Sequence, residues 1–146
     1  MEDYYYDSSL KDVSEWAVST WEAATSGDIF GDGRVGISLE WGVYDQVNSI
    51  TLGNYENPDV LGVTSIWYRG KNIYEYDIML DTDYFPVGLY DLDTVMLHEF
   101  GHGAGLGDLY DAACAEQVMF YRLGTDDVKQ ALQDGDKAGI QILYGP

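Results

Sequence analysis

Cysteine and histidine are scarce in this chain of 146 residues, which has one cysteine and two histidines. A single cysteine excludes an internal disulfide and a zinc site built on a cysteine pair. We expect Cys114 to behave as a small buried hydrophobe. With only His98 and His102 available, a metal site of three imidazoles is excluded, and so is a second, histidine-rich metal site elsewhere in the chain.

Basic residues are also few. The chain has 7 Lys plus Arg against 26 Asp plus Glu, which gives a formal net charge of −19. Such a surface repels phosphate groups, so nucleic acids and anionic membranes are poor partners. Three explanations of the acidity stay open: it keeps the protein soluble, it suits a high-salt habitat, or some of the carboxylates bind Ca²⁺.

Long apolar runs, repeats and Pro/Ser-rich linkers are absent. No stretch approaches the roughly 20 apolar residues of a membrane-spanning helix. The chain starts with the acidic stretch Met1-Glu2-Asp3-Tyr4 and has no basic region or apolar run there, so we expect no signal peptide in this chain. With 46% hydrophobic and 14% aromatic residues, the composition is that of one folded domain, residues 1–146.

Apolar periodicity predicts an α+β fold with the sheet in the N-terminal half. Residues 10–24 carry apolar side chains at spacings of three and four, as in an amphipathic helix. Strands are expected at residues 34–44, 61–68 and 72–80, where β-branched and aromatic residues are frequent.

Two further helices are expected in the C-terminal half. The first begins at Asp91 or Asp93, either of which can cap it, and stops at Gly105. The last covers residues 125–144 with a break at Gly135.

The first of these helices contains an H-E-x-x-H motif, His98-Glu99-Phe100-Gly101-His102. Histidines four residues apart lie on one helix face, so both imidazoles can reach one metal ion. Glu99 projects toward the same side, where it can reach a metal-bound water. The motif extends to H-E-x-x-H-x-x-G-x-x-D, in which Gly105 turns the chain and Asp108 returns as a third ligand.

This donor set favours zinc. Two imidazoles and one carboxylate leave a fourth position open for water, as a catalytic zinc site requires. The only glutamate after His102 is Glu116, which is expected on an irregular loop, so Asp108 is the better third ligand. The alternative is that His98 and His102 are a surface or helix-packing pair, with Glu99 a solvated neighbour.

On these residues the sequence resembles a metzincin zinc metalloprotease, and more narrowly a matrixin (matrix metalloproteinase-like) catalytic domain. Three other segments support the resemblance: a strand that ends in Asp77-Ile78-Met79-Leu80, a Val118-Met119-Phe120 segment similar to the methionine turn, and a Gly139-Ile140-Gln141-Ile142-Leu143-Tyr144-Gly145 ending. Two features depart from the family. Asp108 stands where most matrixins have histidine, and Phe120-Tyr121-Arg122 replaces the usual Pro-x-Tyr.

The resemblance implies a twisted mixed sheet with an antiparallel edge strand, an active-site helix, a methionine turn and a C-terminal helix. It also implies a zinc-dependent endopeptidase, in which Glu99 is the general base for attack of zinc-bound water on a peptide bond. Tyr121 stands where some metzincins place a tyrosine that reaches the metal ion or the oxyanion. The alternative for Tyr121 is an ordinary aromatic residue.

The resemblance further implies a protein or peptide substrate bound extended along an edge strand within residues 61–69, a monomer, and an extracellular location. Three acidic pairs are candidates for Ca²⁺ as a second cofactor, Asp28 with Asp32, Asp81 with Asp83, and Asp91 with Asp93, although such pairs more often serve as turns or helix caps. The competing function is a non-catalytic metal-binding or peptide-binding domain that keeps the fold.

Overall fold

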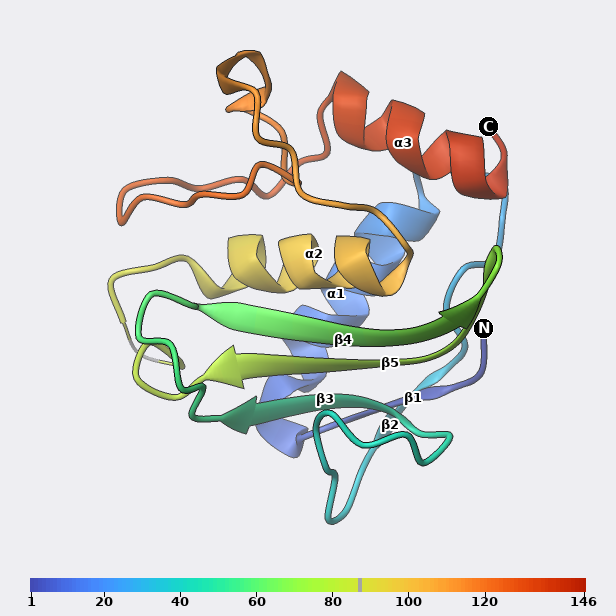
Figure 1. Cartoon of the computed structure of the whole chain (residues 1–146), viewed down its shortest axis with the longest axis vertical. Helices are drawn as coiled ribbons and strands as arrows, with labels where there is room; N and C mark the ends of the chain where they lie inside the picture. Colours follow the sequence, from blue (N-terminus) through green and yellow to red (C-terminus); the bar gives the residue numbers. More distant parts are fainter. Residues whose placement is uncertain (87) are drawn as a thin grey trace.

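A five-stranded mixed sheet forms the base of the molecule, with strand order β2-β1-β3-β5-β4. The computed structural model describes residues 1–86 and 88–146. Its strands are β1 (Tyr4–Tyr6), β2 (Gly33–Val35), β3 (Asn48–Gly53), β4 (Gly62–Arg69) and β5 (Asn72–Asp81). All neighbouring strands run parallel except β4, which pairs antiparallel with β5 and forms an edge of the sheet (Figure 1). The expected α+β fold with an antiparallel edge strand is confirmed.

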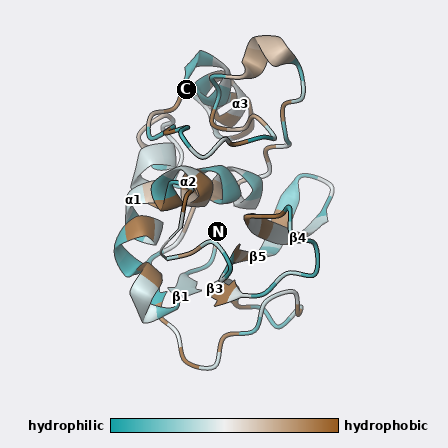
Figure 2. Cartoon of the chain, turned by 90° about the vertical axis from the view of Figure 1, so that its left-hand side faces the viewer, coloured by the Kyte–Doolittle hydropathy of each residue, from teal (hydrophilic) through white to brown (hydrophobic). Residues whose placement is uncertain are grey.

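In the described part of the chain, three α-helices accompany the sheet: α1 (Lys11–Glu22), α2 (Leu92–Gly103) and α3 (Asp134–Tyr144). The indole Nε1 of Trp21 in α1 donates to the carbonyl of Leu97 in α2, at 2.8 Å. Phe100 is fully buried where α2 meets Tyr4 and Tyr76 of the sheet. Figure 2 shows that stretches of α2 and of the central strands are hydrophobic. The helix face that buries Leu97 and Phe100 therefore fixes how α2 lies on the sheet.

Strand β5 is buried on both of its faces. Ile78 and Leu80 point to one face and belong to the hydrophobic core of the protein. On the opposite face, Asp77 accepts the backbone N–H of Gly42 at 2.8 Å, and Glu75 accepts that of Asp45 at 3.1 Å. These buried carboxylates fasten the loop between β2 and β3 across the outer face of the sheet.

The prediction of a strand over residues 34–44 is wrong beyond its first residues. Strand β2 ends at Val35, and the next apolar residue in the alternating pattern, Ile37, is 90% exposed. The backbone donors of the following loop bond to carboxylates of β5 instead of to a neighbouring strand. The strands that were not predicted, β1 and β3, lie in the interior of the sheet.

Two other predictions fail in the C-terminal half. Helix α3 begins at Asp134, so residues 125–133 are not helical, and Gly135 lies in the first turn of α3 rather than at a break. The segment before α3 bonds to other elements instead; the backbone N–H of Lys129, for example, donates to Thr94 Oγ1. Cys114, expected to be buried, ends a short 3₁₀ turn and is partly exposed. Among the helices within residues 1–86 and 88–146, none is long and apolar enough to cross a membrane.

Candidate active site

Helix α2 carries the candidate ligands His98 and His102, and the chain reverses direction after it, which brings the third candidate, Asp108, back toward them. Asp91, one of the two expected caps, accepts the backbone N–H of Thr94 at 3.0 Å and begins the helix. Past the last turn, Gly105 adopts φ +98°, and the N–H of Leu106 donates to the carbonyl of Gly101 at 2.9 Å. This is a Schellman cap, which needs a residue without a Cβ at the left-handed position. The predicted stop at Gly105 is confirmed, and the reversal returns Asp108 to the helix.

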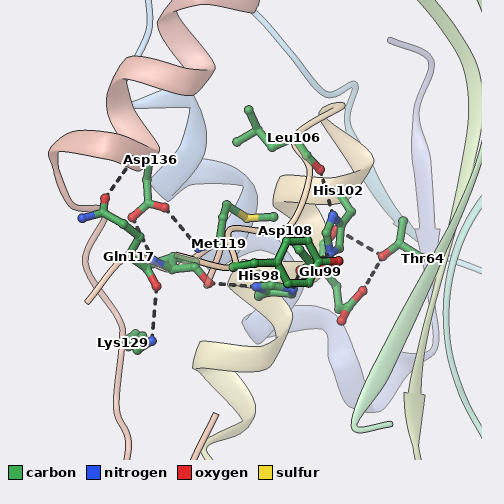
Figure 3. A network of polar contacts seen from close by, with 12 residues as sticks. Thr64, His98, Glu99, His102, Leu106, Asp108, Gln117, Met119, Lys129 and Asp136 are labelled. Carbon is green, nitrogen blue, oxygen red and sulfur yellow. Dashed lines mark hydrogen bonds and ion pairs between the residues drawn. The ribbon is translucent and has the colours of Figure 1, made fainter. Parts of the chain in front are cut away.

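Three ligand atoms converge at this reversal (Figure 3). The Nε2 atoms of His98 and His102 lie 3.0 Å apart. Asp108 Oδ1 lies 3.1 Å from the first and 3.3 Å from the second. A tetrahedral zinc ion with bonds of 2.0–2.2 Å keeps its ligands about 3.3–3.6 Å apart. The three atoms would therefore separate by only a few tenths of an ångström to hold such an ion. Within the described part of the chain, no other group of three or more His, Cys, Asp or Glu side chains converges in this way.

Backbone carbonyls set the tautomers of both histidines. Nδ1 of His98 lies 2.8 Å from the carbonyl oxygen of Val118, and Nδ1 of His102 lies 2.8 Å from that of Leu106. A carbonyl oxygen only accepts, so each Nδ1 carries the proton and each neutral ring turns a lone pair on Nε2 toward Asp108. Among the described residues, Asp108 Oδ1 is buried and has no hydrogen-bond donor as partner. The cluster is therefore electron-rich at its centre and fits a divalent cation.

The contact between His98 and Asp108 shifts the pKa of both side chains. Burial lowers the pKa of His98, but its contact with Asp108 and the charge of Glu99 outweigh burial and leave the pKa above its usual value. The contact with His98 holds the pKa of Asp108 below its usual value, despite partial burial. A proton and a metal ion thus compete for the same lone pairs.

Glu99 lies beside the cluster, against the edge strand. Its side chain is 5% exposed, and Oε2 accepts a hydrogen bond from Thr64 Oγ1 at 2.6 Å. A Cβ at Gly62 would lie 3.1 Å from Glu99 Oε1, so the glycine leaves room for the carboxylate. Thr64 was not singled out from the sequence, because its contact with Glu99 joins residues 35 positions apart. The only available signal was its place in the predicted edge strand.

Met119 packs beneath the histidines, as its likeness to the methionine turn implies. It is 2% exposed, and a Cβ at Gly101 would lie 2.3 Å from its sulfur atom. Asp136 of α3 accepts the backbone N–H groups of Val118 and Met119 at 2.9 and 3.1 Å. Figure 3 shows this network running from α3 to His98. Asp136 is a second contributor that the sequence analysis missed.

A cleft of about 880 Å³ opens over these groups. Strand β4 lines one wall, and segment 118–129 lines the other. Tyr121 lies on this second wall, 46% exposed, with its ring centroid 5.0 Å from that of Tyr110. The hydroxyl of Tyr110 lies 3.4 Å from Asp108 Oδ2. The structure thus places Tyr121 in the cleft, and its catalytic role stays a prediction.

The acidic pairs considered for Ca²⁺ take part in local structure. Asp81 accepts the N–H groups of Tyr55 and Asp83 at 2.9 and 2.8 Å, and Asp91 caps α2. Asp32 lies 3.9 Å from the guanidinium of Arg34. One carboxylate of each pair thus has a contact within the protein, and Ca²⁺ binding stays a prediction.

Comparison with known proteins gives two similarities. The sequence profile of the Matrixin family matches residues 7–145. A stretch of 55 residues is 40% identical to Metalloendoproteinase 2-MMP of Arabidopsis thaliana. That stretch covers 38% of this chain but only 14% of the plant protein, so the similarity spans well under two thirds of that relative.

Proposed function

Since this chain belongs to the matrixin family, we propose that it is a zinc-dependent endopeptidase that hydrolyses peptide bonds in protein substrates. The observation that carries the proposal is the convergence of His98, His102 and Asp108, with Glu99 beside them. Matrixins are typically extracellular, and we place the action of this chain outside the cell.

The four residues divide the chemistry between them. His98, His102 and Asp108 hold the zinc ion, which when bound polarises the scissile carbonyl and makes water a stronger acid. Glu99 accepts the proton of the attacking water and passes it to the nitrogen of the leaving amine. The hydrogen bond from Thr64 keeps the carboxylate of Glu99 turned toward the cleft while this transfer occurs.

The edge strand supplies the substrate-binding surface. Strand β4 pairs on one side with β5 and ends the sheet on the other. Residues Gly62 to Thr64 of β4 line the cleft beside Glu99. An extended peptide that adds to this edge through backbone hydrogen bonds lies across the metal site. The strand therefore binds the main chain and leaves side-chain selection to the opposite wall.

The first test combines metal analysis with proteolysis. We expect one zinc ion per chain, and casein or gelatin cleavage that o-phenanthroline and Glu99→Ala both abolish. Glu99→Ala should keep its zinc, because Glu99 is not a ligand. Glu40→Ala, which removes an exposed glutamate outside the cleft, is the matched control and should cleave normally. Zinc in the wild type with no cleavage of any protein would favour a non-catalytic metal-binding domain, and no bound metal would refute the site.

A further inference from the structure

Two of the seven basic residues of this acidic chain line the candidate active-site cleft, Arg122 and Lys129. Lys11 and Arg34, by contrast, form ion pairs with carboxylates on the surface. Across residues 1–86 and 88–146, neither cleft cation forms an ion pair with an Asp or Glu side chain. Positive charge that is rare elsewhere is thus present at the site and, within the described residues, is not held in an ion pair.

Lys129 is held in the wall of the cleft by three hydrogen bonds. Its backbone N–H donates to Thr94 Oγ1 at 2.8 Å, which places it about one helical turn before His98 on α2. Its ammonium donates to the carbonyls of Ala115 and Gln117, at 2.6 and 3.3 Å. An ammonium has three donors, so one is left without an acceptor among the described residues.

The surroundings strengthen the field of this ammonium. It lies 5.2 Å from the centroid of the Phe120 ring, and Val95 and Leu123 line the same cleft. Apolar walls exclude water and weaken the screening of a charge. Glu116 and Asp127 line a separate hollow of about 230 Å³ that shares both cations, but within the described residues neither carboxylate lies within ion-pair distance of Arg122 or Lys129.

We propose that the recess between α2 and segment 120–129 selects a glutamate side chain of the substrate, with Lys129 and Arg122 as specificity-determining residues. This inference rests on the proposed endopeptidase function. The two methylenes of glutamate pack on the apolar wall, and its carboxylate takes the free donor of Lys129. Arg122 is exposed at the rim, where it attracts the same carboxylate. Asp59, on the opposite wall, disfavours an acidic residue there and so restricts the preference to one side of the cleft.

The test uses pairs of fluorogenic peptides that differ only by Glu or Gln, placed in turn at each position flanking the scissile bond. At one position we expect kcat/KM for the Glu peptide to exceed that for the Gln peptide by about three- to fivefold. Lys129→Met and Arg122→Gln should each bring the ratio toward one, while Lys129→Arg should preserve it. Lys137→Gln, which removes a positive charge on α3 outside the cleft, should leave it unchanged.

The possible failures are distinguishable. Equal or slower cleavage of the Glu peptide at every position overturns this inference and leaves the endopeptidase standing. A preference that survives in both Lys129→Met and Arg122→Gln assigns the selection to other residues and overturns it as well. Because Arg122 is exposed, its variant gives an answer even if Lys129→Met does not fold. Cleavage of neither peptide, with casein also intact, overturns the proposed function and this inference together.

Discussion

Each reactive side chain of the site is oriented by a second group. The carbonyls of Val118 and Leu106 fix the two imidazoles, and the hydroxyl of Thr64 fixes Glu99. Groups held in this way need little rearrangement when a ligand binds, which is how outer contacts contribute to metal affinity and rate.

At the residue scale, Thr64→Val removes the hydroxyl that bonds to Glu99 and keeps the shape of the side chain. We expect kcat to fall by about tenfold, because a hydrogen bond to a charged group contributes roughly 1.5–3 kcal/mol, part of which orients the base. Zinc content should not change. Thr51→Val, the same substitution at a buried position of β3, is the control and should keep full kcat. Equal kcat in the two variants would show that Glu99 does not need Thr64.

At the scale of elements, α3 and the methionine turn form one unit. Asp136 is a buried carboxylate whose two oxygens accept the N–H groups of Val118, Met119 and Gln133. The carbonyl of Val118 then bonds to His98. A helix packed at the far end of the chain therefore determines where one histidine points.

Asp136→Asn should loosen this unit. An amide has one acceptor oxygen, so at least one buried N–H loses its partner, at a cost of about 1–3 kcal/mol in the free energy of unfolding. Urea denaturation measures this loss, and a zinc titration should show weaker binding as well. Asp134→Asn, at the start of the same helix, is the control and should cost only a few tenths of a kcal/mol. Weaker folding with unchanged zinc affinity would separate α3 from the metal site.

The elements that could be predicted from sequence are those whose pattern is local. Helices α1 and α2 and strands β4 and β5 carry long periodic patterns, and the reversal at Gly105 follows from glycine chemistry at a known spacing. The rest depends on distant partners. The loop after β2 bonds to Glu75 and Asp77, and Lys129 of segment 125–133 bonds to α2 and to Ala115 and Gln117, which precede the methionine turn. Thr64 and Asp136 likewise contact site residues that are distant in sequence, so no motif spacing could predict their roles.

At the scale of the whole molecule, a net charge of −19 on 146 residues makes the folded chain repel itself. Added salt screens this repulsion, since the Debye length falls from about 10 Å at 0.1 M to about 3 Å at 1 M. We expect the melting temperature to rise by several degrees between 0.05 and 1 M KCl. Calorimetry in each salt, with an uncharged osmolyte of equal osmolality as control, measures the effect. A melting temperature that is constant or falls would show that the charges are already compensated.

The edge strand has one more consequence, which concerns how the enzyme would reject a poor substrate. In the proposed binding mode, strand β4 pairs with the peptide, and its Thr64 also holds the carboxylate of Glu99. A peptide that pairs with this strand out of register would therefore also change the orientation of the Glu99 carboxylate. Under the proposed binding mode, ill-fitting peptides are still bound but are cut slowly, so the discrimination lies in turnover rather than in affinity.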